Sequence, residues 1–74
     1  MNKAAHLMKQ RGWDATALRD ESIIARNKLS YGTCYTVETS TNWPTDGVNM
    51  GTIKKVAATL GVDWRDLISN NGTE

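Results

Sequence analysis

Hydrogen-bonding side chains gather on one face of a short helix predicted over residues 31–38. Ser30 is a favoured N-cap, because its hydroxyl can accept from a backbone N–H two or three residues later. Cys34 and Val37 lie three residues apart and therefore share the apolar face. The opposite face carries Tyr31, Gly32, Thr33, Tyr35 and Thr36. Such a helix suits the DNA major groove, where base edges present hydrogen-bond donors and acceptors.

Catalytic chemistry has few candidates in this sequence. His6 and Cys34 are the single imidazole and the single thiol, so they form the one available nucleophile–base pair. Cys34 falls on the predicted apolar face, where a thiol is usually inert. His6 has no second ligand at metal spacing, and neither a phosphate-binding loop nor a pair of carboxylates is present. We therefore expect no enzyme activity, no metal site and no cofactor.

The length and composition predict one small domain. The chain has 74 residues, and a domain of roughly this size buries only about 60% of the surface that its unfolded chain exposes. No apolar run approaches the ~20 residues that cross a bilayer, and no basic-then-apolar leader is recognised. One cysteine cannot form an internal disulfide bond. These features favour a cytoplasmic protein with no membrane partner and no small-molecule ligand.

Charge is unevenly distributed along the chain, although the net charge is only +1. Residues 1–37 carry six basic and three acidic side chains, a balance of +3, whereas residues 38–74 carry three basic and five acidic side chains, a balance of −2. The helix predicted over residues 31–38 therefore lies in the basic half. This balance permits a polyanionic partner but does not require one.

Two helices are predicted before the helix over residues 31–38. The first covers residues 2–11 and ends at Gly12, because glycine readily adopts the left-handed conformation common after a helix. The residues that recur in it at helical spacing are Ala4, Leu7, Met8 and Arg11. The second begins after the N-cap Asp14 and runs to about residue 26, either unbroken or bent near Ser22. Its expected apolar face consists of Ala17, Leu18, Ile24 and Ala25.

Turns and loops connect these helices to the rest of the chain. Asn27 and Lys28 are expected to make the turn before Ser30, with Leu29 packing inside. Residues 39–48 form the longest polar stretch, in which residues 44–47 predict a β-turn. Trp43 is expected to anchor this loop to the core, and an exposed contact residue is the alternative.

The last third of the chain predicts two more helices. Asn49 caps the first, Gly61 ends it, and its apolar face is Ile53, Val56, Ala57 and Leu60. Asp63 caps a short final helix that returns Leu67 and Ile68 to the core. Residues 70–74 are expected to be a frayed tail. The sequence therefore predicts an all-α domain of five helices over residues 1–69.

The order of these parts is similar to that of a known family. A helix ending in Arg-Gly-aromatic is followed by a helix, a tight turn and the run Leu-Ser-Tyr-Gly-Thr-x-Tyr-x-Val-Glu. Residues 49–63 are similar to an ending of the form Ser-Leu-x-Thr-Leu-x-x-Ile-Ala-x-x-Leu-Gly-Val-Ser. Together they resemble the lambda-repressor-like, Cro-type (XRE-like) helix-turn-helix DNA-binding family over nearly the whole chain. The resemblance implies a compact five-helix domain whose recognition helix, about residues 31–40, enters the major groove.

The resemblance also implies the roles of individual residues. It implies base contacts from Tyr31, Gly32, Tyr35 and Thr36. Candidate phosphate contacts, which set register without reading sequence, are Arg26, Lys28, Ser30, Thr33, Thr39, Thr41 and Asn42. The family places a small residue midway along the first helix of the motif and a glycine in the turn. Counting back from Cys34 without a gap places Ile24 at the small-residue position and Lys28 at the glycine position. If the turn is one residue shorter than in the family, Ala25 takes the small-residue position instead.

Two functions remain open at this point. The first is sequence-specific binding of double-stranded DNA by a small transcriptional regulator, such as a repressor that acts as a homodimer on a symmetric operator. The second keeps the fold but uses it as a protein-interaction module of the anti-repressor or antitoxin kind. The predicted recognition helix has no Arg, Lys, Gln or Asn, and tyrosine is a frequent interface residue. Candidate dimer contacts are Trp43, Trp64, Leu67 and Ile68.

Overall fold

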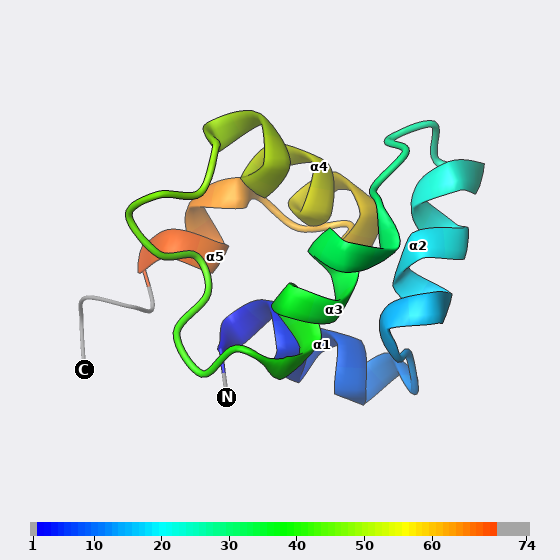
Figure 1. The fold of residues 1–74 in the computed structure, drawn as a ribbon, viewed down its shortest axis with the longest axis horizontal. Coiled ribbons are helices and arrows are strands. Elements are labelled where there is room, and N and C mark those ends of the chain that lie inside the picture. The colour runs from blue at the N-terminus through cyan, green and yellow to red at the C-terminus, as the bar shows by residue number, and fades with distance from the viewer. Residues whose placement is uncertain (1, 70–74) are drawn as a thin grey trace.

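A computed structural model describes residues 2–69 of the protein, and these residues form five α-helices and no strand. The helices are α1 (Lys3–Arg11), α2 (Ala15–Ile24), α3 (Tyr31–Thr39), α4 (Met50–Leu60) and α5 (Trp64–Ser69) (Figure 1). The predicted all-α class and the predicted number of helices are therefore confirmed for this part of the chain. The predicted tail, residues 70–74, lies outside the described residues.

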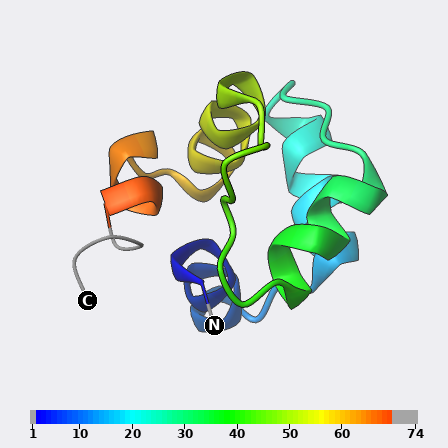
Figure 2. The same ribbon diagram turned by 60° about the vertical axis from the view of Figure 1, so that its left-hand side comes forward.

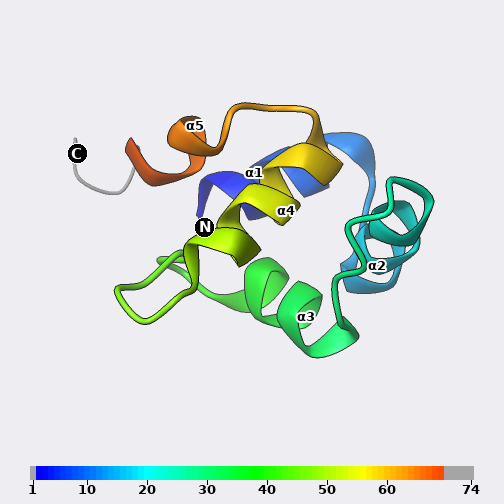
Figure 3. The same cartoon turned by 90° about the horizontal axis from the view of Figure 1, so that it is seen from above.

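The helices enclose one hydrophobic core. α2 and α5 lie at opposite ends of the molecule, with α1, α3 and α4 between them (Figures 1 and 3). α3 packs mainly on α2 and α1, whereas α4 packs on α5, α1 and α2. The segment over residues 40–49 runs from the end of α3 across the molecule to α4 (Figure 2). The largest fully buried side chains are Met8, Leu18, Leu60, Leu67, Val37 and Val56.

The predicted helix caps are present. Asp14, Ser30 and Asn49 accept from the backbone N–H groups at the starts of α2, α3 and α4, those of Ala17, Thr33 and Gly51. α1 and α4 end at Gly12 and Gly61, whose φ angles of 73° and 76° lie in the left-handed region. The predicted apolar face of α4 is buried in full. These features are local in sequence, and they were predicted correctly.

The loop over residues 40–49 is anchored as expected. Trp43 is only 3% exposed and belongs to the core. The N–H of Val48 donates to the carbonyl of Thr45 at 3.1 Å, so the hydrogen-bonded turn spans residues 45–48. The turn therefore begins one residue later than the sequence predicted.

The prediction for α2 was right for Leu18, which is buried, but wrong for Ile24 and Ala25, which are exposed, and for the end of the helix. The helix is continuous through Ser22 and stops at Ile24, about two residues earlier than expected. Its buried residues are Ala15, Leu18 and Ser22, whereas Ile23 and Ile24 are 55% and 74% exposed. Positions 15, 18 and 22 follow the helical period, and a serine occupies the last of them. The bend that was considered near Ser22 is absent.

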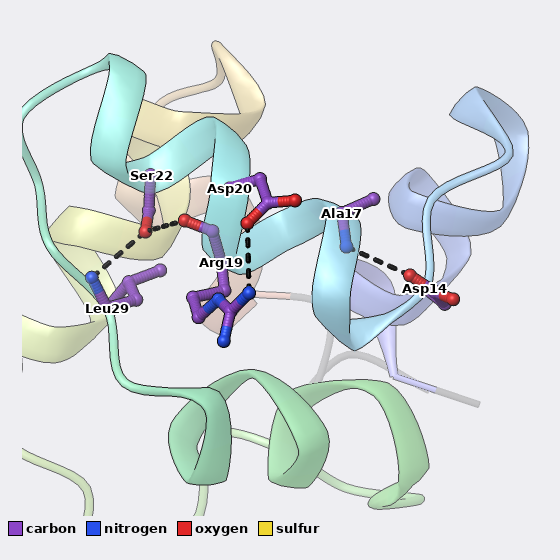
Figure 4. A network of polar contacts seen from close by, with 6 residues as sticks. All are labelled: Asp14, Ala17, Arg19, Asp20, Ser22 and Leu29. Carbon is purple, nitrogen blue, oxygen red and sulfur yellow. Dashed lines mark hydrogen bonds and ion pairs between the residues drawn. The ribbon is translucent and has the colours of Figure 1, made fainter.

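Ser22 is buried because its polar atoms find partners nearby (Figure 4). Its hydroxyl donates to the carbonyl of Arg19 at 2.6 Å and accepts from the N–H of Leu29 at 3.0 Å. Its carbonyl accepts from the N–H groups of Asn27 and Lys28 at 2.7 and 3.1 Å. One residue therefore ends α2 and fixes the chain on its way to α3.

The family resemblance placed a small residue at Ile24 or Ala25, but both are exposed. Ser22 is the small buried side chain near the end of α2, and the junction over residues 25–30 follows it. Arg26 and Lys28 adopt left-handed φ angles of 65° and 53° there, which lets the chain turn back before Leu29 enters the core.

Replacing Ser22 by alanine tests this arrangement. The Ser22→Ala variant leaves the buried N–H of Leu29 without its acceptor, so we expect a loss of about 1–3 kcal/mol in the free energy of unfolding. Thr16→Ala is the matched control on the exposed side of α2, with an expected change within about 0.5 kcal/mol. Urea unfolding measures both. Equal stabilities would show that the Ser22 hydroxyl does not hold the junction.

Candidate nucleic-acid interface

α3 has one buried side and one exposed side. Cys34 and Val37 are fully buried. Tyr31 and Tyr35 are 46% and 53% exposed, and Gly32 and Thr36 are exposed as well. The structure therefore places all four predicted base-contact residues on the solvent side of one helix, where they can reach a ligand together.

The two tyrosines form an aromatic pair along this side. Their ring centroids are 6.2 Å apart, and the planes are inclined by 30°. Within the described residues, neither phenolic hydroxyl has a hydrogen-bond partner. The pair therefore presents both apolar ring surface and polar atoms to solvent, a combination typical of recognition surfaces.

The threonine hydroxyls of α3 are directed to the helix itself. Thr36 donates to the carbonyl of Gly32 at 3.0 Å, and Thr39 donates to the carbonyl of Tyr35 at 2.8 Å. Each hydroxyl proton is therefore already in use, and the oxygen keeps only its capacity to accept. This internal bonding was not anticipated from the sequence.

The first turn of α3 is organised by Ser30. Its hydroxyl accepts from the N–H of Thr33 at 3.2 Å and donates to the hydroxyl of Thr33 at 3.0 Å. Thr33 itself is half-buried, so it is less accessible than the other predicted contact residues. The cap was predicted, and the second bond between the two side chains was not.

The predicted phosphate contacts divide between the two ends of α3. Arg26 and Lys28 are exposed in the junction before the helix, whereas Thr41 and Asn42 are exposed in the segment after it. Ser30 is the N-cap that precedes α3, and Thr39 is the last residue of the helix. The structure therefore brackets the tyrosine face with polar groups, and the basic ones lie at the N-terminal end.

Asn2 fixes the C-terminal end of α3, a role that the sequence reasoning missed. Its side-chain N–H groups donate to the carbonyls of Val37 and Ser40 at 2.9 and 2.7 Å. Its side-chain oxygen accepts from the N–H of Ala5 at 2.6 Å and thereby caps α1. An asparagine just before a helix signals the cap, but no local signal reveals partners 35 and 38 positions away.

Glu38 joins the end of α3 to the start of α2. Its carboxylate accepts from the N–H of Ala15 at 3.0 Å, next to the cap that Asp14 supplies. A hollow of about 380 Å³ lies at this corner, lined by Ala5, Lys9, Gly12, Trp13, Asp14 and Glu38. Both carboxylates there already bind backbone N–H groups, so they act as helix caps.

The two residues considered for catalysis are a buried thiol on α3 and an exposed imidazole on α1. Burial raises the pKa of the Cys34 thiol, and this effect is larger than the opposite effect of the Arg19 charge. The thiol is therefore held in its unreactive neutral form. His6 is exposed on α1 and hydrogen-bonds to Gln10 at 3.2 Å. Within residues 2–69, no three His, Cys, Asp or Glu side chains gather closely enough to hold a metal ion.

The candidate dimer contacts change once burial is known. Trp43 and Leu67 are core residues, and Trp64 and Ile68 are half-buried. Trp43 and Leu67 therefore cannot meet a second chain in this fold. Among the described residues, the large apolar side chains that are exposed are Ile23, Ile24, Tyr31, Tyr35 and Met50. Four of these five lie on α2 and α3.

No protein-family model, curated protein or solved structure matches this chain. None of the helices in the described part is both long enough and apolar enough to span a membrane. The case for a function therefore depends on the exposed side of α3 and on the groups that position it.

Replacing the buried Asn2 by aspartate tests whether its side chain holds the C-terminal end of α3. Asn2→Asp keeps the oxygen that caps α1 but replaces the two N–H donors by a carboxylate oxygen facing two carbonyls. We expect a loss of about 1–3 kcal/mol or more in the free energy of unfolding at neutral pH. Asn42→Asp makes the same change at an exposed position and should shift stability by less than about 0.5 kcal/mol. Thermal unfolding followed by circular dichroism compares them, and equal losses would contradict the role of Asn2.

Proposed function

We propose that this chain binds double-stranded DNA by placing α3 in the major groove. On this proposal it is a cytoplasmic, homodimeric transcription regulator of the lambda-repressor-like helix-turn-helix type. The observation that carries the proposal is the division of α3 into a buried side and an exposed side of hydrogen-bonding and aromatic groups. A groove reader needs this division, because the buried side fixes the helix while the exposed side meets the base edges.

The pairing of α2 with α3 supports the same proposal. The two helices are consecutive and pack directly on each other, as the two helices of a helix-turn-helix do. In that arrangement the second helix enters the groove while the first crosses the backbone. The junction over residues 25–30 connects the two helices and leaves α3 exposed along its outer side.

Electrostatics favour phosphate contacts at the N-terminal end of α3. Arg26 and Lys28 are exposed there, and the N–H groups of Tyr31 and Gly32 lie in the first turn, where a helix offers them no carbonyl partner. Helix N-termini bind anions readily for this reason. Two cationic contacts per chain predict a slope of log affinity against log salt near −2, or about −4 for a dimer.

A salt titration with matched charge variants tests the proposal. Fluorescence anisotropy with a mixed-sequence duplex should show affinity that falls steeply as salt rises. Lys28→Gln should weaken binding and reduce the magnitude of the slope by about one per chain. Arg65→Gln removes the same charge from α5, at the end of the molecule opposite α2, and should leave the slope unchanged (Figure 1). Equal effects of the two variants, or no binding at low salt, would overturn the proposal.

A second candidate is a protein-interaction module with the same fold. Ile23 and Ile24 are exposed at the end of α2, and Tyr31 and Tyr35 are exposed on the adjacent α3. Exposed apolar and aromatic side chains of this kind are used at protein interfaces. An absence of DNA binding at low salt, in a protein that is folded by circular dichroism, would favour this candidate.

A further inference from the structure

The exposed side of α3 lacks the side chains that usually identify a base. Guanine is most often read by Arg or Lys and adenine by Asn or Gln, each through two hydrogen bonds, and cytosine donates to Asp or Glu. α3 contains none of the first four types. Its one carboxylate, Glu38, is engaged with the N–H of Ala15. Direct reading by paired hydrogen bonds is therefore not available to this helix.

The hydroxyl groups of α3 do not replace those side chains. Thr36 and Thr39 donate their protons to carbonyls of their own helix. The phenolic hydroxyls of Tyr31 and Tyr35 can either donate or accept, so they fit a base-edge donor and a base-edge acceptor equally well. A hydroxyl of this kind adds affinity but discriminates poorly between base pairs.

The remaining exposed groups of α3 that could contact a base are the two aromatic rings. Tyr31 and Tyr35 are each about half exposed, and their centroids are 6.2 Å apart. The one apolar feature of the major groove is the C5-methyl group of thymine, which apolar side chains contact. A 5-methylcytosine carries the same methyl group at the same ring position. The two rings span about two base-pair steps of ~3.4 Å each.

We infer that α3 reads DNA through the C5-methyl groups of pyrimidines, which pack against the rings of Tyr31 and Tyr35. This inference rests on the proposed function, because it names the chemical group that the proposed DNA interface selects. It predicts sites in which two methylated pyrimidines lie within about two base-pair steps of each other. Thymine and 5-methylcytosine are the two sources of this group, and they are distinguished by experiment.

The test removes or adds single methyl groups. A duplex is first selected with the full chain from a random-sequence pool, and each thymine is then replaced by deoxyuridine, which lacks only the methyl group. At the contacted positions we expect about a fourfold loss of affinity per methyl group, as for burial of one CH₂. Replacing these thymine–adenine pairs by 5-methylcytosine–guanine and by cytosine–guanine pairs then shows whether a methyl group on cytosine also restores binding.

Ring variants connect the methyl effect to the two tyrosines. Tyr35→Phe keeps the ring and should keep the difference between thymine and deoxyuridine. Tyr35→Ala removes the ring, and the difference at its partner position should vanish. Lys28→Gln should weaken binding to both duplexes by the same factor, which makes it the control for a general loss of affinity. Circular dichroism checks that the total helix content is unchanged, as expected for changes at a half-exposed position.

The possible outcomes distinguish methyl reading, the role of the two rings and DNA binding itself. Equal affinity for thymine and deoxyuridine duplexes, together with a steep salt dependence, would overturn methyl reading and leave the DNA-binding proposal standing. A methyl effect that persists in Tyr31→Ala and Tyr35→Ala would overturn the role of the rings. Failure to select or bind any duplex at low salt would overturn both the inference and the function on which it rests.

Discussion

The hydrogen bonds of Ser22 are the constraint on which the rest of the structure depends. A buried hydroxyl is costly unless it is paired, and here it receives the N–H of Leu29 and binds the carbonyl of Arg19. This pairing allows a serine to occupy a core position of α2. It also fixes where Leu29 enters the core and therefore where α3 begins. The direction of the tyrosine face follows from that starting point.

α3 depends on such anchors because it is weak by itself. It has nine residues, among them a glycine and several β-branched side chains, and isolated helices of this length are not stable in water. Ser22 and Leu29 hold its N-terminal end, while Asn2 and Glu38 hold its C-terminal end. A helix fixed at both ends is ordered before a ligand arrives, so binding does not have to supply that ordering free energy.

Local signals explain what could be predicted from the sequence. The caps Asp14, Ser30 and Asn49 act on N–H groups two or three residues away, and the face of α4 repeats with the helical period. The exposure of Tyr31 and Tyr35 follows from the burial of Cys34 and Val37 in the same helix. For this reason the exposed side of α3 could be predicted from the sequence.

Side-chain hydrogen bonds that a helical pattern does not reveal explain what was missed. The helical period of the apolar residues placed Ile24 on the buried face and Ser22 at a possible bend, whereas the structure exposes the isoleucine and buries the serine. The serine is favoured because its hydroxyl bonds to the carbonyl of Arg19 in the same helix and to the N–H of Leu29 in the junction that follows. The bonds from Asn2 to Val37 and Ser40 join residues far apart in sequence, so no helical pattern could reveal them.

The central claim is that the exposed side of α3 is the surface that meets DNA. The most direct measurement is a titration of the ¹⁵N-labelled chain with a duplex, followed by the amide shifts of each residue. The account predicts the largest changes at Tyr31, Gly32, Tyr35 and Thr36. Trp64 on α5 marks an alternative surface: its ring centroid lies 5.6 Å from the Lys54 ammonium and 4.9 Å from the Arg65 guanidinium, which also pairs with Asp63 at 3.3 Å. Changes centred on Trp64, or no changes at all, would contradict the account.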